Sequence, residues 1–194
     1  MITLSIKDQN KIRSLSKFLS LILRHKPETI GITLDNHGWA NVDELIEGVK
    51  RSGKQFDLDL LNRVVVENDK QRFSFNDDKT KIRANQGHSK SVDVELEEKI
   101  PPKILYHGTQ EKNSSSIATQ GLLKMNRLYV HLSGDLETAV KVADRRVGEK
   151  IIYEIDTAAM IKEGYKFFQS VNNVWLIDHV PPKFLKIIST QKNR

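Results

Sequence analysis

The chain has no cysteine among its 194 residues. Disulfide frameworks, zinc sites with thiolate ligands and cysteine nucleophiles are therefore excluded. It also lacks an apolar run near the roughly 18 residues of a membrane span, and its first ten residues do not resemble the apolar segment of a secretory signal. A glycine-rich phosphate loop of the P-loop or Rossmann type is missing as well. These absences predict a cytoplasmic protein with no membrane association and disfavour the classical nucleotide-binding folds.

Basic residues outnumber acidic ones. Lysine and arginine total 31 against 25 for aspartate and glutamate, a formal net charge of +6, which favours an anionic partner such as a nucleic acid. The length suits one large domain or two small ones, since domains contain roughly 100 to 200 residues.

A basic amphipathic helix is predicted over residues 11–25. Its apolar residues recur at spacings of three and four, which is typical of one buried helical face. Arg13, Lys17 and Arg24 fall within about 40° of one another on the opposite side. An RNA backbone could lie along this face, although a solvated face of a packed helix explains the pattern equally well.

Two further helices and a hairpin complete the first half. Asn41 and Glu44 form a capping-box pattern, and Asp57 suits the start of a third helix. Residues 72–75 and 81–84 alternate with period two around a turn-rich segment. Three helices followed by a hairpin predict a winged-helix lobe over residues 1–85.

The second half has the composition of an α+β lobe. Periodicity fades over residues 86–102, where Pro101 and Pro102 prevent regular structure, so this segment is predicted to be a linker. The remaining residues, 103–194, contain short strand patterns at 104–106, 128–131, 151–155, 174–177 and 184–188, and helical patterns at 115–120 and 136–146. Gly121 is predicted to end the first of these helices.

Three residues of the first half could act on a phosphate. Arg24 and His25 lie in the last turn of the basic helix, where a guanidinium matches phosphate oxygens and an imidazole can move a proton near neutral pH. A favourable interaction with the helix dipole is the alternative. Arg72 faces away from Phe73 and Phe75 and is either a cleft residue or an ordinary residue of a surface strand.

In the second half, polar residues follow two predicted strands. His107, Gly108 and Thr109 come directly after the strand that ends at Tyr106, and a glycine there would let a ligand approach the backbone. His131 and Ser133 end another strand in the same way. Together they could form one polar site, but each histidine alone could be structural.

The remaining candidates have simpler explanations. Arg145 and Arg146 are placed at the end of a helix, and Asn172 and Asn173 in a turn. No metal is expected, because His88, His107, His131 and His179 lack the short spacing of metal ligands.

Six motifs in order resemble the RNA 2′-phosphotransferase family across residues 15 to 188. They are Leu23-Arg24-His25, Asn68-Asp69-Lys70-Gln71-Arg72-Phe73, Gln86-Gly87-His88-Ser89, His107-Gly108-Thr109, Val130-His131-Leu132-Ser133 and the Arg145 segment. The resemblance implies a winged-helix lobe that binds RNA and a second lobe similar to ADP-ribosyltransferases, with the active site between them.

The resemblance also implies a two-step, NAD-dependent reaction. An internal RNA 2′-phosphate attacks the nicotinamide riboside of NAD⁺ and expels nicotinamide. The ribose 2″-hydroxyl then attacks phosphorus, which releases RNA with a free 2′-hydroxyl and ADP-ribose 1″,2″-cyclic phosphate.

The family's catalytic residues correspond to Arg24, His25, Arg72 and Arg145. The alternative to Arg145 is Arg146, because Ala143 stands where the family pattern has glycine. By the same resemblance His107, Gly108, Thr109, His131 and Ser133 would bind NAD, with Asn173 a weaker candidate beside Asn172.

Two other functions stay open. One is a winged-helix protein that binds nucleic acid without catalysis, although acidic residues such as Asp57, Asp59 and Glu67 make the third helix a poor DNA-binding surface. The other is a mono-ADP-ribosyltransferase that modifies proteins. The expected substrate is RNA with an internal 2′-phosphate, and the expected state is a monomer.

Overall fold

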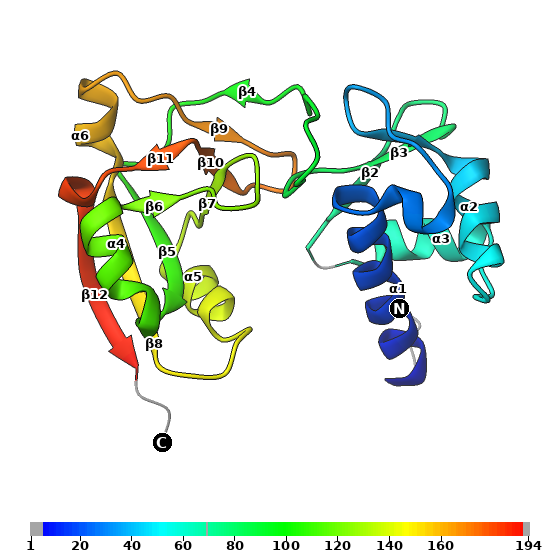
Figure 1. Cartoon of the computed structure of the whole chain (residues 1–194), viewed down its shortest axis with the longest axis horizontal. Coiled ribbons are helices and arrows are strands. Elements are labelled where there is room, and N and C mark those ends of the chain that lie inside the picture. Colours follow the sequence, from blue (N-terminus) through cyan, green and yellow to red (C-terminus); the bar gives the residue numbers. More distant parts are fainter. Residues whose placement is uncertain (1–5, 69, 192–194) are drawn as a thin grey trace. The chain divides into compact units, whose positions relative to one another are not determined.

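Two units with separate hydrophobic cores make up the chain, residues 1–95 and residues 96–194. The structure, a computed structural model, describes residues 6–68 and 70–191 (Figure 1). Every strand pairing is antiparallel, and helices and sheets occur in both units, which confirms the α+β class. None of the described helices is both long enough and apolar enough to cross a membrane.

The division between the units lies inside the segment 86–102. Residues up to Glu95 belong to the first unit, because the backbone after the hairpin is hydrogen-bonded to earlier residues. The Ser89 N–H donates to the Arg24 carbonyl at 3.1 Å, and the Asp93 N–H donates to the Asn36 carbonyl at 2.8 Å. Residues 86–95 therefore pack against the first unit.

The first unit contains three helices that begin and end at recognisable residues. They are α1 (Ile6–Arg24), α2 (Val42–Arg51) and α3 (Leu58–Val66), with a 3-10 turn η1 (Pro27–Ile30) after α1. Asn41 accepts from the Glu44 N–H at 3.0 Å, and Asp57 accepts from the Leu60 N–H at 2.8 Å. Both caps were predicted from the sequence, and both are confirmed.

A small sheet accompanies these helices. Strands β1 (Trp39–Asn41), β2 (Phe73–Phe75) and β3 (Lys81–Ala84) pair in the order β1-β3-β2. The predicted hairpin is β2 with β3, in the register Ser74 to Arg83. The strand β1, which the sequence analysis did not predict, adds to the other side of β3.

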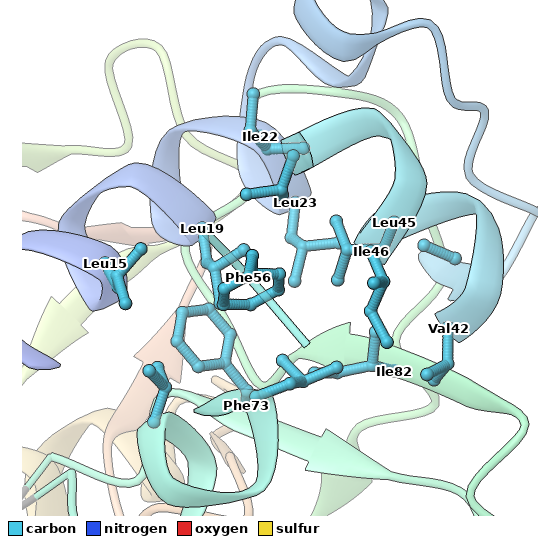
Figure 2. Close-up of a cluster of buried hydrophobic side chains, with 14 of the residues drawn as sticks. Leu15, Leu19, Ile22, Leu23, Val42, Leu45, Ile46, Phe56, Phe73 and Ile82 are labelled. Carbon is cyan, nitrogen blue, oxygen red and sulfur yellow. The ribbon is translucent and has the colours of Figure 1, made fainter. Parts of the chain in front are cut away.

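The first core forms between α1, the other helices and the sheet. Leu19, Ile22 and Leu23 of α1 belong to one buried cluster with Leu45 of α2 and Phe73 of β2 (Figure 2). The basic residues of α1 lie on its other side, where Lys11, Arg13 and Lys17 are exposed. The predicted positive outer face is therefore present at Arg13 and Lys17, whereas Arg24, which was predicted to share it, is half-buried.

The second unit is built from two larger sheets and a strand pair. Strands β5 (Ile104–Gln110), β8 (Lys150–Asp156) and β12 (Leu185–Gln191) form one sheet in the order β12-β8-β5. The other sheet has the order β4-β9-β10-β7 and consists of β4 (Glu97–Glu98), β9 (Phe168–Gln169), β10 (Trp175–Ile177) and β7 (Val130–Leu132). A separate pair consists of β6 (Leu122–Leu123) and β11 (His179–Val180).

Three helices and two 3-10 turns connect these strands. They are α4 (Ser114–Gln120), α5 (Leu136–Ala143), α6 (Thr157–Lys162), η2 (Glu111–Asn113) and η3 (Pro182–Phe184). Helix α5 packs on β5 and β8 through Ala139, Ala143 and Ile152. Gly121 follows α4, as predicted, and has a positive φ of 76°.

Two predicted boundaries in this unit are wrong. The strand expected to end at Tyr106 continues to Gln110, because β5 pairs with β8 along its whole length. The helix expected to reach Arg146 ends at Ala143. There the chain turns back, the Gln110 side chain donates to the Arg146 carbonyl, and the Glu111 N–H donates to the Glu149 carbonyl. These tertiary contacts outweigh helix propensity.

Candidate active site

In the first unit, Arg24 and His25 stand at the end of α1. Both are half-buried, and the His25 N–H completes the last turn by donating to the Leu21 carbonyl at 3.0 Å. Nδ1 of His25 is hydrogen-bonded to the hydroxyl of Ser89 at 2.9 Å. The segment that follows β3 therefore lies directly beside this pair.

Arg72 is attached to the middle of α1. Its Nη1 donates to the Ser16 hydroxyl at 3.0 Å and to the Asn68 side-chain oxygen at 3.1 Å. Asn68 also donates to Ser16 at 2.7 Å, and these two polar side chains are only 5% and 2% exposed. Asn68 was named in a family motif without a role, and Ser16 was missed, although its place between Leu15 and Leu19 on the apolar face of α1 was a visible signal.

Asn85 fixes the backbone on which Arg72 stands. Its N–H donates to the Arg72 carbonyl at 2.9 Å, and its side chain donates to the Gln71 carbonyl at 2.7 Å. The Ser74 hydroxyl donates to the Asn85 side-chain oxygen at 2.7 Å. Gln71 has φ of 39°, a conformation that costs free energy for a residue other than glycine and needs such support.

These contacts place three predicted catalytic residues around one side of α1. Arg72 reaches α1 at Ser16, eight residues, or about 12 Å of helix, before Arg24. The chain then runs from Asn85 beside Arg72 to Ser89 beside His25. A guanidinium group matches phosphate oxygens and an imidazole can transfer a proton, so these residue types are compatible with phosphate chemistry.

In the second unit, the predicted dinucleotide-binding segments lie side by side. Tyr106 and Ser133 exchange two backbone hydrogen bonds, of 2.9 and 2.8 Å. Nδ1 of His107 donates to the His131 carbonyl at 3.0 Å. Because a carbonyl can only accept, the hydrogen is on Nδ1, and Nε2 of neutral His107 is an acceptor. Burial lowers the pKa of His107, which favours this neutral form.

Gly108 is required by the packing of α5. It lies within β5 rather than after it, and a Cβ atom there would come within 2.0 Å of the Ala139 carbonyl oxygen. The prediction that Gly108 follows the end of the strand is therefore wrong. Helix α5 occupies the side of β5 on which a Cβ atom of residue 108 would lie. Thr109, on the same face of β5 as His107, accepts a hydrogen bond from the Asn113 side chain at 3.0 Å.

Arg127 contacts His131 and is influenced by two further arginines. Nη1 of Arg127 donates to Nδ1 of His131 at 3.3 Å, so Nε2 of neutral His131 carries the hydrogen. Partial desolvation of Arg127, followed by repulsion from Arg145 and Arg146, lowers the pKa of Arg127. Arg145 and Arg146 are exposed in the turn after α5. The sequence analysis missed Arg127, which could have been found from its spacing of four residues from His131.

Asn172 and Asn173 form the predicted turn, between β9 and β10. The Ser170 hydroxyl donates to the Asn172 side-chain oxygen at 2.8 Å, and Asn173 has φ of 60°. Since Trp175 pairs with Leu132 in antiparallel register, this turn lies toward the end of β7 that leads into Ser133. Within residues 6–68 and 70–191, no three histidine, aspartate or glutamate side chains gather as metal ligands.

Comparisons with known proteins cover all these residues. A family model described as RNA 2′-phosphotransferase, Tpt1 / KptA family, matches residues 9–179. The chain is 59% identical over 172 residues to a probable RNA 2′-phosphotransferase of Fusobacterium nucleatum subsp. nucleatum, an alignment that spans 89% of this chain and 96% of that protein. It is 54% identical over 182 residues to a probable RNA 2′-phosphotransferase of Flavobacterium johnsoniae, which spans 94% of this chain and 100% of that protein. The similarity therefore extends through both units.

Proposed function

The chain belongs to the RNA 2′-phosphotransferase, Tpt1 / KptA family, and from this premise we propose that it removes an internal 2′-phosphate from RNA in an NAD-dependent reaction. The resemblance drawn from the six motifs is confirmed at the level of the family. A transferase that acts on RNA is the general function that follows.

One observation carries the proposal. The Arg72 side chain is hydrogen-bonded to Ser16 of α1. The segment from Asn85 to Ser89 runs from the backbone of Arg72 to Arg24 and His25, with hydrogen bonds at both ends. Guanidinium groups present several donors in a fixed plane that matches phosphate oxygens. This arrangement favours a phosphate as the group acted on.

We assign the arginines to orientation and charge stabilisation. Arg24 and Arg72 would hold the nonbridging oxygens of the RNA phosphate, and Arg145 of the second unit would complete the set. Fixing a phosphate in a productive orientation lowers the barrier by several kcal/mol when the geometry is good. His25 would give or take a proton at Nε2, because its Nδ1 is hydrogen-bonded to Ser89.

We assign the binding of NAD⁺ to polar side chains of the second unit. Bound NAD⁺ supplies a ribose carbon that accepts the phosphate as nicotinamide leaves. His107, Thr109, His131 and Ser133, from β5 and the end of β7, would hold the nicotinamide riboside, with the backbone of Gly108 beside them and Asn173 nearby. Arg127 beside His131 is a cationic donor of the kind that suits the dinucleotide's phosphates.

The proposal extends to the fold of each unit and to the substrate. We assign the first unit to the winged-helix class on its three helices and following hairpin, and the second to the ADP-ribosyltransferase class. The RNA would lie along the basic face of α1, a spliced tRNA being one candidate, and the protein would act as a monomer in the cytoplasm.

The test uses the full chain with NAD⁺ and a short RNA that carries one internal 2′-phosphate. Loss of the phosphate together with stoichiometric nicotinamide release is the expected result. RNA binding without turnover would support a non-catalytic nucleic-acid-binding protein instead. Transfer of label from NAD⁺ to protein, with the RNA unchanged, would support a mono-ADP-ribosyltransferase.

A further inference from the structure

The segment Gln86-Gly87-His88-Ser89 crosses the end of α1, where its backbone and side chains lie beside Arg24 and His25. Gly87 has φ of 86°, and a Cβ atom there would lie 3.5 Å from Nη1 of Arg24. The positive φ suits glycine and turns the chain over the arginine side chain. The two residues that follow then lie next to Arg24 and His25.

His88 anchors this segment in the first unit. Its side chain is 1% exposed, and among the described residues neither ring nitrogen has a hydrogen-bond partner. Burial, with Arg24, His25 and Arg83 nearby, lowers its pKa to about 4. Its Nε2 is 3.3 Å from where a Cβ of Gly38 would be. A neutral imidazole therefore fills the space between the Gly38 turn and the end of α1.

Ser89 makes two contacts with the candidate catalytic pair. Its backbone N–H donates to the Arg24 carbonyl at 3.1 Å, and its hydroxyl is 2.9 Å from Nδ1 of His25. One contact fixes Ser89 on the helix end, and the other fixes the plane of the imidazole ring.

We propose that Ser89 is the positioning residue of His25, holding its ring by Nδ1 so that Nε2 faces the reacting phosphate. This inference rests on the proposed function. The orientation of the ring, however, is a property of the protein alone and can be measured without turnover.

The hydroxyl group suits this role because it both donates and accepts. When His25 is protonated, Nδ1–H donates to Ser89; when the ring is neutral, the hydroxyl can donate to a bare Nδ1. A backbone carbonyl would hold only the tautomer with hydrogen on Nδ1. Nδ1–H donates to the hydroxyl while Nε2 gains and loses a proton, and the hydroxyl donates to Nδ1 in the other neutral tautomer, so serine keeps one ring orientation in every protonation state of His25.

The kinetic test is a double-mutant cycle in single-turnover assays with saturating NAD⁺. Ser89→Ala should slow phosphate removal about tenfold to a hundredfold while leaving the Kd for RNA within about twofold, and Ser89→Thr should restore most of the rate. In a His25→Ala background, Ser89→Ala should have no further effect. The matched control is Ser91→Ala, two residues along in the same exposed segment. Additive losses in the cycle, or a Ser89→Ala rate equal to that of Ser91→Ala, would overturn the proposal.

A second measurement separates this inference from the proposed function. Nitrogen-15 NMR of the histidine rings in the free protein should show a changed tautomer ratio for His25 in Ser89→Ala and not in Ser91→Ala. Unchanged His25 signals would disprove the positioning role of Ser89 even if the enzyme removes phosphate. A changed ratio in a protein without activity would reject the proposed reaction and keep the contact.

Discussion

The hydroxyl of Ser16 lies 3.0 Å from Nη1 of Arg72, although 56 residues separate them in the sequence. Asn68 joins both groups, donating to Ser16 and accepting from Arg72. A helix side chain and a turn side chain thus determine where a strand-end arginine points. Arg72 is positioned by buried polar groups, so its function should depend on residues that never touch a substrate.

Replacing Asn68 should therefore impair catalysis through Arg72. Asn68→Ala removes these two hydrogen bonds and a third, from the Lys70 N–H to the Asn68 side-chain oxygen at 3.0 Å. It also leaves the Ser16 hydroxyl buried with one partner fewer, which costs about 1–3 kcal/mol of unfolding free energy. We expect a single-turnover rate at least tenfold lower at a temperature where the variant is folded. Asn62→Ala, at the partly exposed surface of α3, is the matched control. Equal rates for the two variants would contradict the positioning of Arg72 by Asn68.

The stability of the first unit should decrease in acid because of His88. Its pKa is about 4 in the folded protein against the ordinary value of 6.5 for an exposed histidine, so the unfolded chain binds the proton first as the pH falls. The part of the free energy of unfolding that depends on neutral His88 is fully present above pH 6.5. It is lost between pH 6.5 and about 4, at up to about 1.4 kcal/mol per pH unit. Above pH 6.5 His88 adds no pH dependence.

Denaturant unfolding across this range, compared with His88→Leu, isolates the effect. Leucine can take the place of a ring whose nitrogens have no partner within the described residues, and it cannot titrate. The wild-type free energy of unfolding should fall more steeply than that of His88→Leu between pH 6.5 and 4. Parallel curves would show that His88 is accessible to protons in the folded state.

The basic face of α1 should contribute to RNA affinity through charge alone. Lys11, Arg13 and Lys17 are exposed, and none of the ion pairs within the described residues includes them. The logarithm of the binding constant for RNA falls linearly with the logarithm of the salt concentration. Removing one residue that contacts a phosphate should make this slope shallower by about 0.7 for single-stranded RNA. Fluorescence anisotropy with Arg13→Ala and Lys17→Ala measures this slope. Lys186→Ala, an exposed lysine of β12, serves as the control, and a slope equal to the control's in every variant would exclude this face as the RNA contact.

Adding one methyl group to Gly108 should damage the second unit. A Cβ atom would lie 2.0 Å from the Ala139 carbonyl oxygen, so α5 must move away from β5, at a cost of about 3 kcal/mol or more. Thermal unfolding of Gly108→Ala should show a clearly lower Tm. Gly134→Ala is the control, since its Cβ would meet Trp175 at 3.7 Å, an ordinary contact distance. An unchanged Tm for Gly108→Ala would mean that the close approach of α5 relaxes without cost.

Local patterns predicted the first unit well because short-range physics fixes most of it. The Asn41 and Asp57 caps, the stripe of α1 and the β2–β3 hairpin all depend on residues within a few positions of each other. The added strand β1 depends instead on pairing with β3, whose residues are at least 40 positions away. No period-two pattern in three residues could have predicted it.

The candidate site was proposed from residue types, which give less information on the groups that hold these residues in place. Arg24, His25, Arg72, His107 and His131 were identified from residue chemistry and family motifs. The partners of Arg72 and His25, Ser16 and Ser89, come from distant parts of the chain, and the sequence does not show which distant group either serine contacts. The end of α5 was misplaced for the same reason, because contacts between Gln110 and Arg146 decide it.

Either Arg145 or Arg146 could be the proposed catalytic arginine of the second unit, and substitutions can distinguish between them. Arg145 and Arg146 are both exposed after α5, and both raise the local positive potential at Arg127. Removing one donor that stabilises transition-state charge typically slows catalysis by about a hundredfold to a thousandfold. We expect that loss for Arg145→Ala in single turnover, partly reversed by Arg145→Lys because a lysine keeps the charge but not the planar donor pair. Arg146→Ala should lose less than about tenfold, since the backbone carbonyl that it offers to Gln110 is kept. If Arg146→Ala shows the larger loss, the catalytic position shifts by one residue, and if neither variant is slowed, the second unit contributes no arginine to the reaction.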